Sequence, residues 1–263
     1  MRTGARSSGF YYIRESGDSP VRVFCDLASE SGWAWTLVMS QSFRNRKIQQ
    51  LMRVPLSSDA PLNSSNPNWE AYRLSLKKMK ELRTESSHWR VTCNFPTDVF
   101  DYRDYVKGNF SQVNLLNVDG HNVCRMVDYI NVKGRNCSHC TVAWWQDTGT
   151  MFHHDLSLGK CFFETFINVN TVFNADYFGW YENIDSSFSC RTDDSSSTNH
   201  WFGAQIWRYF QTGPVPIGSS PKIEPGRFFA DTRPGARFSR APEIFRDCKS
   251  IFSSSVYFSS WWM

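Results

Sequence analysis

The chain has 263 residues, 16% of them aromatic, and a formal net charge of +4. This length allows one large domain or two small ones with a sizeable core. The charge is mildly basic and lacks the clustered Lys/Arg face of nucleic-acid-binding proteins, so we expect no nucleic-acid partner. No apolar run reaches the length of a membrane-spanning helix, so we expect no membrane span.

The cysteine content predicts the compartment. Eight dispersed cysteines favour disulfides in an oxidising space over a cytosolic metal site. The disulfide candidates are Cys25, Cys93, Cys124, Cys137, Cys140, Cys161 and Cys190. Asn-x-Ser/Thr sequences at Asn63, Asn109 and Asn136 are candidate glycosylation sites, which also indicate a secreted, extracellular protein. Residues 1–6 lack the apolar segment of a signal peptide, so we expect the chain to be truncated upstream.

The first elements expected are three strands within residues 9–40. Three apolar and aromatic runs alternate there with Gly/Ser/Asp/Pro clusters, a pattern typical of a strand meander. In the middle run Val21, Val23 and Cys25 share one face. Residues 33–39 are almost wholly apolar and are predicted to be buried on both faces.

A helix is predicted within residues 66–83. Apolar side chains recur there at a helical period, at Trp69, Tyr72, Leu76, Met79 and Leu82. Asn68 is the candidate N-cap. A basic run toward the C-terminal end is interpreted as a solvated helix face, with an anionic partner site as the alternative. The run comprises Lys77, Lys78, Lys80 and Arg83.

The middle of the chain predicts further strands. Residues 88–98 and 121–132 each have strand character, and residues 141–145 form a short strand after the cysteine-rich segment 134–140. Residues 161–203 are rich in aromatic residues, Asn and Asp but show no period, so irregular loops with short strands are expected there.

The last 53 residues have a different composition. Residues 211–263 hold six of the eleven prolines together with Phe/Arg pairs and Ser repeats, which predicts a poorly ordered extension. An aberrant translated tail is the alternative. Cys248 lies in this extension and is expected to have no partner in the domain.

Three linked motifs follow one another in the first 40 residues. They consist of Ser8, Gly9, Tyr11 and Ile13; then Val21, Val23, Cys25 and Asp26; then Gly32, Trp35, Thr36, Leu37 and Val38. Together they resemble the opening of the fibrinogen-related C-terminal domain. Later segments resemble invertebrate members of that family, so the resemblance covers residues 8–203. The alternative is an unrelated β domain.

The resemblance implies an α+β, fibrinogen C-terminal-like fold with antiparallel sheets, few helices and a loop-rich C-terminal third. It assigns residues 1–210 to that domain and leaves 211–263 as the extension. In the family, the cysteine that corresponds to Cys25 pairs with a cysteine upstream of the first motif. None precedes Cys25 here, which agrees with an N-terminally clipped domain and leaves an odd cysteine that could link an oligomer.

The Cys137-Ser-His-Cys140 motif has two interpretations. With His139, His153 and His154 it could form a zinc site, but a second C-x-x-C is absent, and adjacent histidines on a strand point apart. We therefore favour a disulfide over a metal. The resemblance also implies bridged cysteines at this position.

Calcium is the cofactor that the resemblance raises. Fibrinogen-related domains often bind it through an acidic D-x-D-type loop, because calcium prefers six to eight oxygen ligands. That pattern is missing between Cys161 and Cys190, so no metal ligand is named and calcium stays an open alternative.

The candidate ligand surface is an aromatic stretch in the last third of the domain. Aromatic faces stack on sugar rings or enclose ammonium groups, and amides and imidazoles add hydrogen bonds. Packing in the core is the alternative for each residue. The candidates are Tyr177, Trp180, Tyr181, Asn183, His200 and Trp201.

The favoured function is an extracellular, lectin-like recognition module for glycans or acetylated surface groups. The second hypothesis is a structural or adhesive matrix protein with protein partners. The third is a zinc-dependent enzyme built on Cys137, Cys140 and the nearby histidines. No nucleophile elbow, phosphate loop or other catalytic motif occurs, so we expect no enzyme and name no catalytic residue.

Overall fold

The computed structural model describes residues 7–13, 20–95, 102–117, 120–154, 161–163 and 178–206. The strands are β1 (Gly9–Ile13), β2 (Val21–Asp26), β3 (Trp33–Ser42), β4 (Ala71–Arg73), β5 (His88–Cys93), β6 (Tyr105–Asn109), β7 (Gly120–Val132), β8 (Arg135–Asp147), β9 (Thr150–His154) and β10 (Ser197–Gln205). The helices are α1 (Gln49–Met52) and α2 (Leu76–Thr84), with 3₁₀ turns η1 (Phe43–Asn45) and η2 (Ser189–Arg191).

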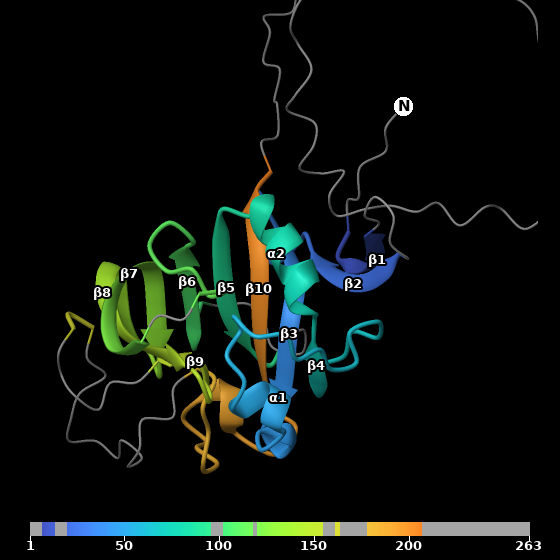
Figure 1. Ribbon diagram of the computed structural model, residues 1–263. Coiled ribbons are helices and arrows are strands. Elements are labelled where there is room, and N and C mark those ends of the chain that lie inside the picture. The colour runs from blue at the N-terminus through green and yellow to red at the C-terminus, as the bar shows by residue number, and fades with distance from the viewer. Residues whose placement is uncertain are drawn as a thin grey trace, which may run out of the picture.

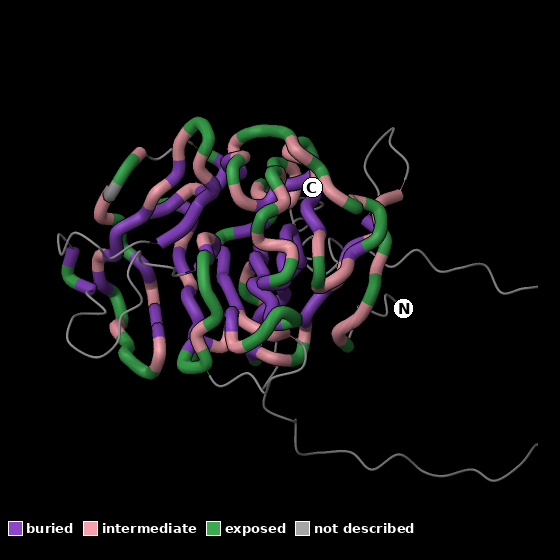
Figure 2. Tube along the Cα trace, turned by 90° about the horizontal axis from the view of Figure 1, so that it is seen from below, coloured by how far each residue is buried: buried purple, intermediate pink, exposed green. Residues whose placement is uncertain are grey.

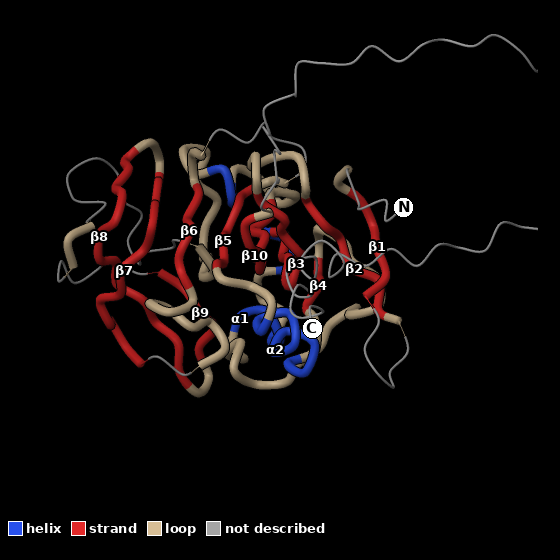
Figure 3. Tube along the Cα trace, turned by 90° about the horizontal axis from the view of Figure 1, so that it is seen from above, coloured by secondary structure: helices blue, strands red, loops and turns tan. Residues whose placement is uncertain are grey.

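The described strands form one antiparallel sheet. Their order is β1-β2-β3-β10-β5-β6-β7-β8-β9, and β4 pairs with β3 beside this path. Figure 1 shows β10 in the middle of the sheet, and Figures 1 and 3 place both helices over one of its faces. The expected α+β, fibrinogen C-terminal-like fold with a loop-rich C-terminal third is therefore wrong: residues from that third provide a central strand, and the sheet dominates.

Strand β10 forms from a segment that was expected to be loop, because its polar residues find partners inside the sheet. Asn199 donates to Ser40 Oγ (2.8 Å) and accepts from the Phe95 backbone N–H (3.1 Å). Buried polar groups are tolerated when they are hydrogen-bonded in this way. Gly203 lets the ring of Trp35 lie against the strand, because a Cβ at Gly203 would come within 2.4 Å of that ring. The polar residues of this segment therefore belong to a buried strand, where neighbouring strands supply their hydrogen-bond partners.

The N-terminal strands confirm the predicted meander. Strands β1 and β2 pair antiparallel over five residues, and β2 pairs with β3. Val23 and Cys25 are buried on one side of β2, as their alternation predicts. All ten residues of β3 are buried, because β2, β4 and β10 pair with it and side chains cover both its faces.

The predicted helix within residues 66–83 is only partly correct. Helix α2 begins after Ser75, whose hydroxyl accepts from the Lys78 N–H. Residues Ala71–Arg73 are instead strand β4, paired with β3. Asn68 is not the N-cap: its side chain accepts from the Glu70 and Ala71 N–H groups in a turn before that strand. Pairing with β3 overrides the helical period over the first half of the segment.

Strands β7 and β8 form a long hairpin. Lys133 and Gly134 connect them, both with positive φ (54° and 85°), as a two-residue type I′ turn requires. The predicted strand at 121–132 is confirmed, whereas the short strand at 141–145 is the end of a thirteen-residue strand. That strand includes the C-x-x-C motif.

The two faces of the sheet have different coverings. Arg90 on β5 and Trp201 on β10 are direct cross-strand neighbours, so their side chains share one face. Phe202 points to the opposite face, where it packs edge-on against Phe110 (4.8 Å between ring centroids). Arg83 of α2 lies over Phe110, so the helix covers that second face. Figure 2 shows buried residues through the centre and exposed residues in the outer loops.

Candidate functional site

A buried ion-pair network lies on the sheet face opposite α2. Arg90 donates to Asp26 Oδ2 at 2.5 Å and lies 3.5 Å from Glu30 Oε2. Its guanidinium also lies over the rings of Trp35 and Trp201, at 4.6 and 5.0 Å from their centroids. Burial alone would raise the pKa of Asp26, but Arg90 and the hydrogen bonds to the carboxylate outweigh it and hold that pKa below its usual value.

The turn after β2 places Glu30 at the edge of this network. Asp26 Oδ1 accepts from the backbone N–H groups of Ala28 and Ser29, both at 3.1 Å, which folds the chain back on itself. The Glu30 carbonyl then accepts from the Trp33 N–H at 3.1 Å. Local turn chemistry thus brings Glu30 and Trp33 close together beside β5 and β6.

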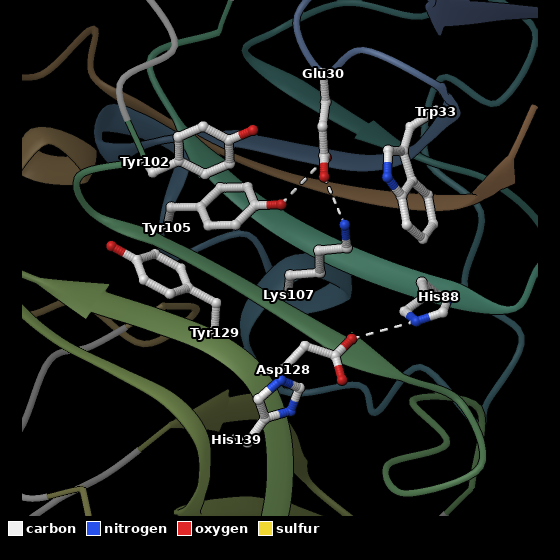
Figure 4. A pocket seen from close by; sticks show the side chains of 9 residues that line it. All are labelled: Glu30, Trp33, His88, Tyr102, Tyr105, Lys107, Asp128, Tyr129 and His139. Carbon is white, nitrogen blue, oxygen red and sulfur yellow. Dashed lines mark hydrogen bonds and ion pairs between the residues drawn. The ribbon is translucent and has the colours of Figure 1, made fainter.

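An open pocket of about 570 Å³ lies above this network. We call it the Glu30 pocket, and Figure 4 shows its side chains pointing toward a common space. Four separate parts of the chain contribute to it: the β2–β3 turn, β5, residues around β6, and the β7–β8 hairpin. It is lined by Glu30, Trp33, His88, Tyr102, Tyr105, Lys107, Asp128, Tyr129 and His139.

The floor of the pocket is an ion pair against an indole ring. Lys107 Nζ lies 2.5 Å from Glu30 Oε1 and 3.5 Å from the centroid of the Trp33 ring. Trp33 in turn stacks on Trp35, with ring centroids 5.0 Å apart and planes 13° from parallel. Burial lowers the pKa of Lys107, and Glu30 opposes that shift. An ammonium held by a carboxylate and an aromatic face is a stable arrangement for a largely buried lysine.

Three tyrosines form one wall. The Tyr105 hydroxyl donates to Glu30 Oε2 at 3.4 Å, and burial raises the pKa of Tyr105 well above its usual value. Tyr102 and Tyr129 pack against Tyr105, with ring centroids 5.3 and 6.1 Å away. Tyr105 is buried, whereas Tyr102 is 41% exposed. The wall therefore offers aromatic surface to the solvent side of the pocket.

The opposite wall is polar. His88 Nε2 lies 3.2 Å from Asp128 Oδ2, and His88 Nδ1 lies 2.8 Å from the Ser87 hydroxyl. Asp128 is partly exposed, and a carboxylate can accept several hydrogen bonds, so Asp128 can also accept from a ligand. His139 is exposed beside it. This wall supplies hydrogen-bonding groups facing the tyrosines.

Unusual backbone conformations occur around the pocket. Tyr102, Asp104, Lys133 and His139 all have positive φ, between 48° and 63°. Non-glycine residues adopt this region at an energetic cost, so surrounding contacts must hold them there. Asp104 is such a contact: its carboxylate accepts from the Lys133 N–H (2.6 Å) and the Ser189 N–H (2.9 Å). This buried carboxylate joins the tyrosine wall to the turn of the β7–β8 hairpin.

The residues predicted from sequence to form a ligand surface do not line this pocket. Tyr181, His200 and Trp201 are buried, and burial with a contribution from Arg73 lowers the pKa of His200 to about 3. Trp180 is half-buried between His153 and Arg53, and Asn183 is exposed. Tyr177 lies outside the described residues. Of the six, Trp201 contacts the network below the pocket, through Arg90.

The sequence carries a signal for several of these pocket residues. Tyr105 and Lys107 alternate on β6, and His88 and Arg90 alternate on β5, so each pair shares one face of the sheet. Alternating aromatic and charged residues on adjacent strands indicate a polar, ligand-accessible face. The pairing of β5 with β6, which brings the two pairs together, was not predictable from spacing.

All seven candidate cysteines are disulfide-bonded. Within the described residues the pairs are Cys93–Cys190, Cys124–Cys161 and Cys137–Cys140. Cys25 is also disulfide-bonded. The C-x-x-C motif is therefore a disulfide, as predicted, and the disulfides are consistent with an extracellular protein. Cys248 lies outside the described residues.

The described part of the chain shows no clustered group of three His, Cys, Asp or Glu side chains that could hold a metal ion. Asp185, one of the scattered acidic residues of the last third, instead pairs with Lys133 and Arg191. Two candidate glycosylation sites, Asn63 and Asn136, are exposed. Asn109 is half-buried, with its side chain near His88.

No helix in the described ranges is long and apolar enough to cross a membrane. Comparison with known proteins adds no family: no family model, no curated protein and no solved structure matches this chain.

Proposed function

We propose that this chain is an extracellular recognition module that binds a neutral glycan in the Glu30 pocket. The observation that carries the proposal is the meeting of exposed tyrosine surface with hydrogen-bonding side chains in one open cavity. Ligand sites combine apolar and aromatic lining with a few placed polar groups. Sugar rings present both an apolar face and hydroxyl groups, so they match both walls.

The charges favour a neutral ligand. Glu30 is engaged on both oxygens, by Lys107 on one and by Tyr105 and Arg90 on the other. Asp128 is the more accessible carboxylate and would repel an anionic ligand while accepting hydrogen bonds from hydroxyls. Lys107 lies over Trp33, so that aromatic face is already covered by a cation of the chain itself. Neutral polyols suit this balance better than anions or ammonium groups.

Two further observations support an extracellular role. The disulfides agree with an oxidising compartment. The motif resemblance to fibrinogen-related sequences, many of which are recognition proteins, points the same way.

The test is binding of the secreted full-length chain to an array of neutral, N-acetylated and sialylated glycans. The array is run in calcium and again with a chelator. We expect binding to neutral or N-acetylated sugars, weak binding to sialylated ones, and the same result with the chelator. Loss of binding with the chelator would instead reveal a calcium-dependent site. Folded protein that binds nothing would refute the proposal.

Variants locate the binding. Tyr102→Ala removes an exposed ring from the pocket, and its matched control is Tyr12→Ala, which removes an equally exposed ring (44% against 41%) on β1. An aromatic contact is worth about 0.5–1.5 kcal/mol, so Y102A should weaken binding by about two- to twelvefold. Asp128→Asn should also weaken it, with the exposed Asp194→Asn as control. Equal effects of Y102A and Y12A would place the site elsewhere.

One observation favours the adhesive alternative. Strand β1 is an outer strand of the described sheet, and it exposes Phe10 and Tyr12. Exposed edges with apolar side chains can accept a strand from a partner protein. Binding to immobilised extracellular matrix proteins that is lost in F10S/Y12S, with a blank glycan array, would support this second function.

A further inference from the structure

The Cys137–Cys140 disulfide bends strand β8. A regular strand rises about 3.3 Å per residue, so two residues three apart lie about 10 Å from one another. The Cα atoms of these cysteines are 6.2 Å apart, although both lie within β8. The bend falls at His139, which has a left-handed backbone with φ of 48°. Histidine adopts this region more readily than most residues, but it remains unfavourable for any side chain with a Cβ.

The bend lies against the Glu30 pocket. Tyr129 pairs with Ser138, and Val127 pairs with Cys140, so Asp128 lies across from His139 in the hairpin. Both Asp128 and His139 line the pocket, and Tyr129, the next residue after Asp128, belongs to its tyrosine wall (Figure 4). Any change in the path of β8 at His139 therefore changes the polar wall of the pocket directly.

This disulfide joins residues that are already neighbours. The other described pairs link residues 97 and 37 positions apart, whereas Cys137 and Cys140 are separated by three. Stabilisation by a disulfide grows with the length of the loop it closes. The Cys137–Cys140 bond therefore contributes least to the stability of the fold, and its main effect is local.

We propose that the Cys137–Cys140 disulfide is a redox-sensitive lock on the Glu30 pocket. The inference rests on the proposed function, namely that the pocket binds a ligand. In the oxidised chain the lock holds His139 beside Asp128. After reduction β8 relaxes toward a regular strand, and His139 leaves its left-handed conformation and its place in the pocket wall.

The reduction requires a dithiol reductant. One of its thiolates attacks a sulfur of the Cys137–Cys140 bond, which breaks and leaves a mixed disulfide with one free cysteine thiolate. The second thiol of the reductant then displaces the other cysteine. Two electrons pass to the protein, both cysteines end as thiols, and the reductant becomes a disulfide. Cys140 is buried, whereas Cys137 is half-buried beside the exposed Ser138 and His139, so the reductant reaches the sulfur of Cys137 first.

The first experiment measures the order of reduction in the full chain. Dithiothreitol is titrated, free thiols are alkylated with iodoacetamide, and mass spectrometry identifies the alkylated cysteines. We expect Cys137 and Cys140 to be alkylated at reductant concentrations that leave Cys93–Cys190 and Cys124–Cys161 intact. Reduction of either long-range disulfide before this one would overturn the proposal.

The second experiment follows His139 without any ligand. After selective reduction and alkylation, diethyl pyrocarbonate labels exposed histidines, and labelling rates are compared with those of the oxidised chain. The rate at His139 should change at least twofold, while His121, on the same hairpin but paired with Asp147, stays constant. The C137S/C140S variant should show the same His139 rate without reductant. An unchanged His139 in both would overturn the lock.

Glycan binding then tests the regulatory consequence separately. C137S/C140S should bind the glycan identified on the array at least threefold differently from the oxidised chain, with circular dichroism showing equal folding. Equal affinity would overturn regulation while leaving the binding function intact. If neither chain binds any glycan on the array, the binding function and the regulation that rests on it are both refuted. The order of reduction and the labelling of His139 would still decide whether the lock exists.

Discussion

Replacing Arg90 tests whether the buried network supports the Glu30 pocket. Arg90→Met keeps an unbranched apolar stem but removes the cation that faces Asp26 and Glu30. Removing one partner of a buried ion pair costs about 3–5 kcal/mol, because the other charge is left buried and uncompensated. Since domains are stable by about 5–15 kcal/mol, R90M should lose a large part of its free energy of unfolding.

The pH dependence of this loss identifies its cause. The folded-state pKa of Asp26 lies below its usual value, so Asp26 stabilises the fold above the unfolded-state pKa and loses this contribution as pH falls through the folded-state pKa. R90M removes the main cause of the lowered pKa. The difference between wild type and R90M should therefore be largest near pH 7 and shrink as pH falls. Without Arg90, burial raises the pKa of Asp26, so the carboxylate of R90M is protonated first, and the wild-type carboxylate follows only below the usual aspartate pKa of about 3.9.

Urea unfolding at pH 7 and pH 3, with disulfides intact, measures both effects. Lys107→Met is the matched control, because Glu30 then keeps Arg90, and its cost should be less than half that of R90M. In D26N/R90M the two losses should not add, since the buried pair is removed together. A cost below about 1 kcal/mol for R90M at pH 7, or an equal cost at both pH values, would refute the reasoning.

Two further predictions concern the central strand. Gly203→Ala would bring a Cβ within 2.4 Å of the Trp35 ring, so it should cost about 1–3 kcal/mol or more in the free energy of unfolding measured in urea. Gly9→Ala, whose new Cβ would have no atom closer than 4.0 Å, should cost little. Equal costs for the two variants would contradict the packing argument. His200 is buried and its pKa is lowered to about 3, so the unfolded state takes up a proton before the folded state does as the pH falls. The free energy of unfolding should therefore decrease from about pH 6.5 down to pH 3, by up to about 1.4 kcal/mol per pH unit. H200Q should flatten this slope and the exposed-site variant H121Q should not; an unchanged slope in H200Q would show that His200 is not its source.

The sequence predicts the N-terminal part of the fold better than the rest. Val23 and Cys25 alternate with half-buried residues, and the apolar run of β3 is long enough to read as buried on both faces. These are local patterns that survive in the folded protein. Helix α2 is shorter than its period suggests, because Ala71–Arg73 pairs with β3, a contact 30 residues distant in sequence.

The central strand and the pocket could not be predicted from local pattern. The polar residues of β10 indicate a loop, and only hydrogen bonds such as that from Asn199 to Ser40 make a buried strand of them. The pocket joins residues between Glu30 and His139, whose proximity depends on the strand order β5-β6-β7. Aromatic content suggests both packing and ligand surface, but burial of Trp201 and exposure of Tyr102 are decided by tertiary contacts.

The central place of β10 also sets the order in which the chain can fold. It lies between β3 and β5, so a nascent chain that ends before Ser197 leaves one edge of each of these two strands unpaired. Such edges are prone to pair with other chains, and contacts between distant residues slow folding. The sheet can close only after the chain has been synthesised through β10. Cys190 precedes β10 by a few residues and bonds to Cys93 at the end of β5, so oxidation of this pair can hold the late segment beside its final position before β10 enters the sheet.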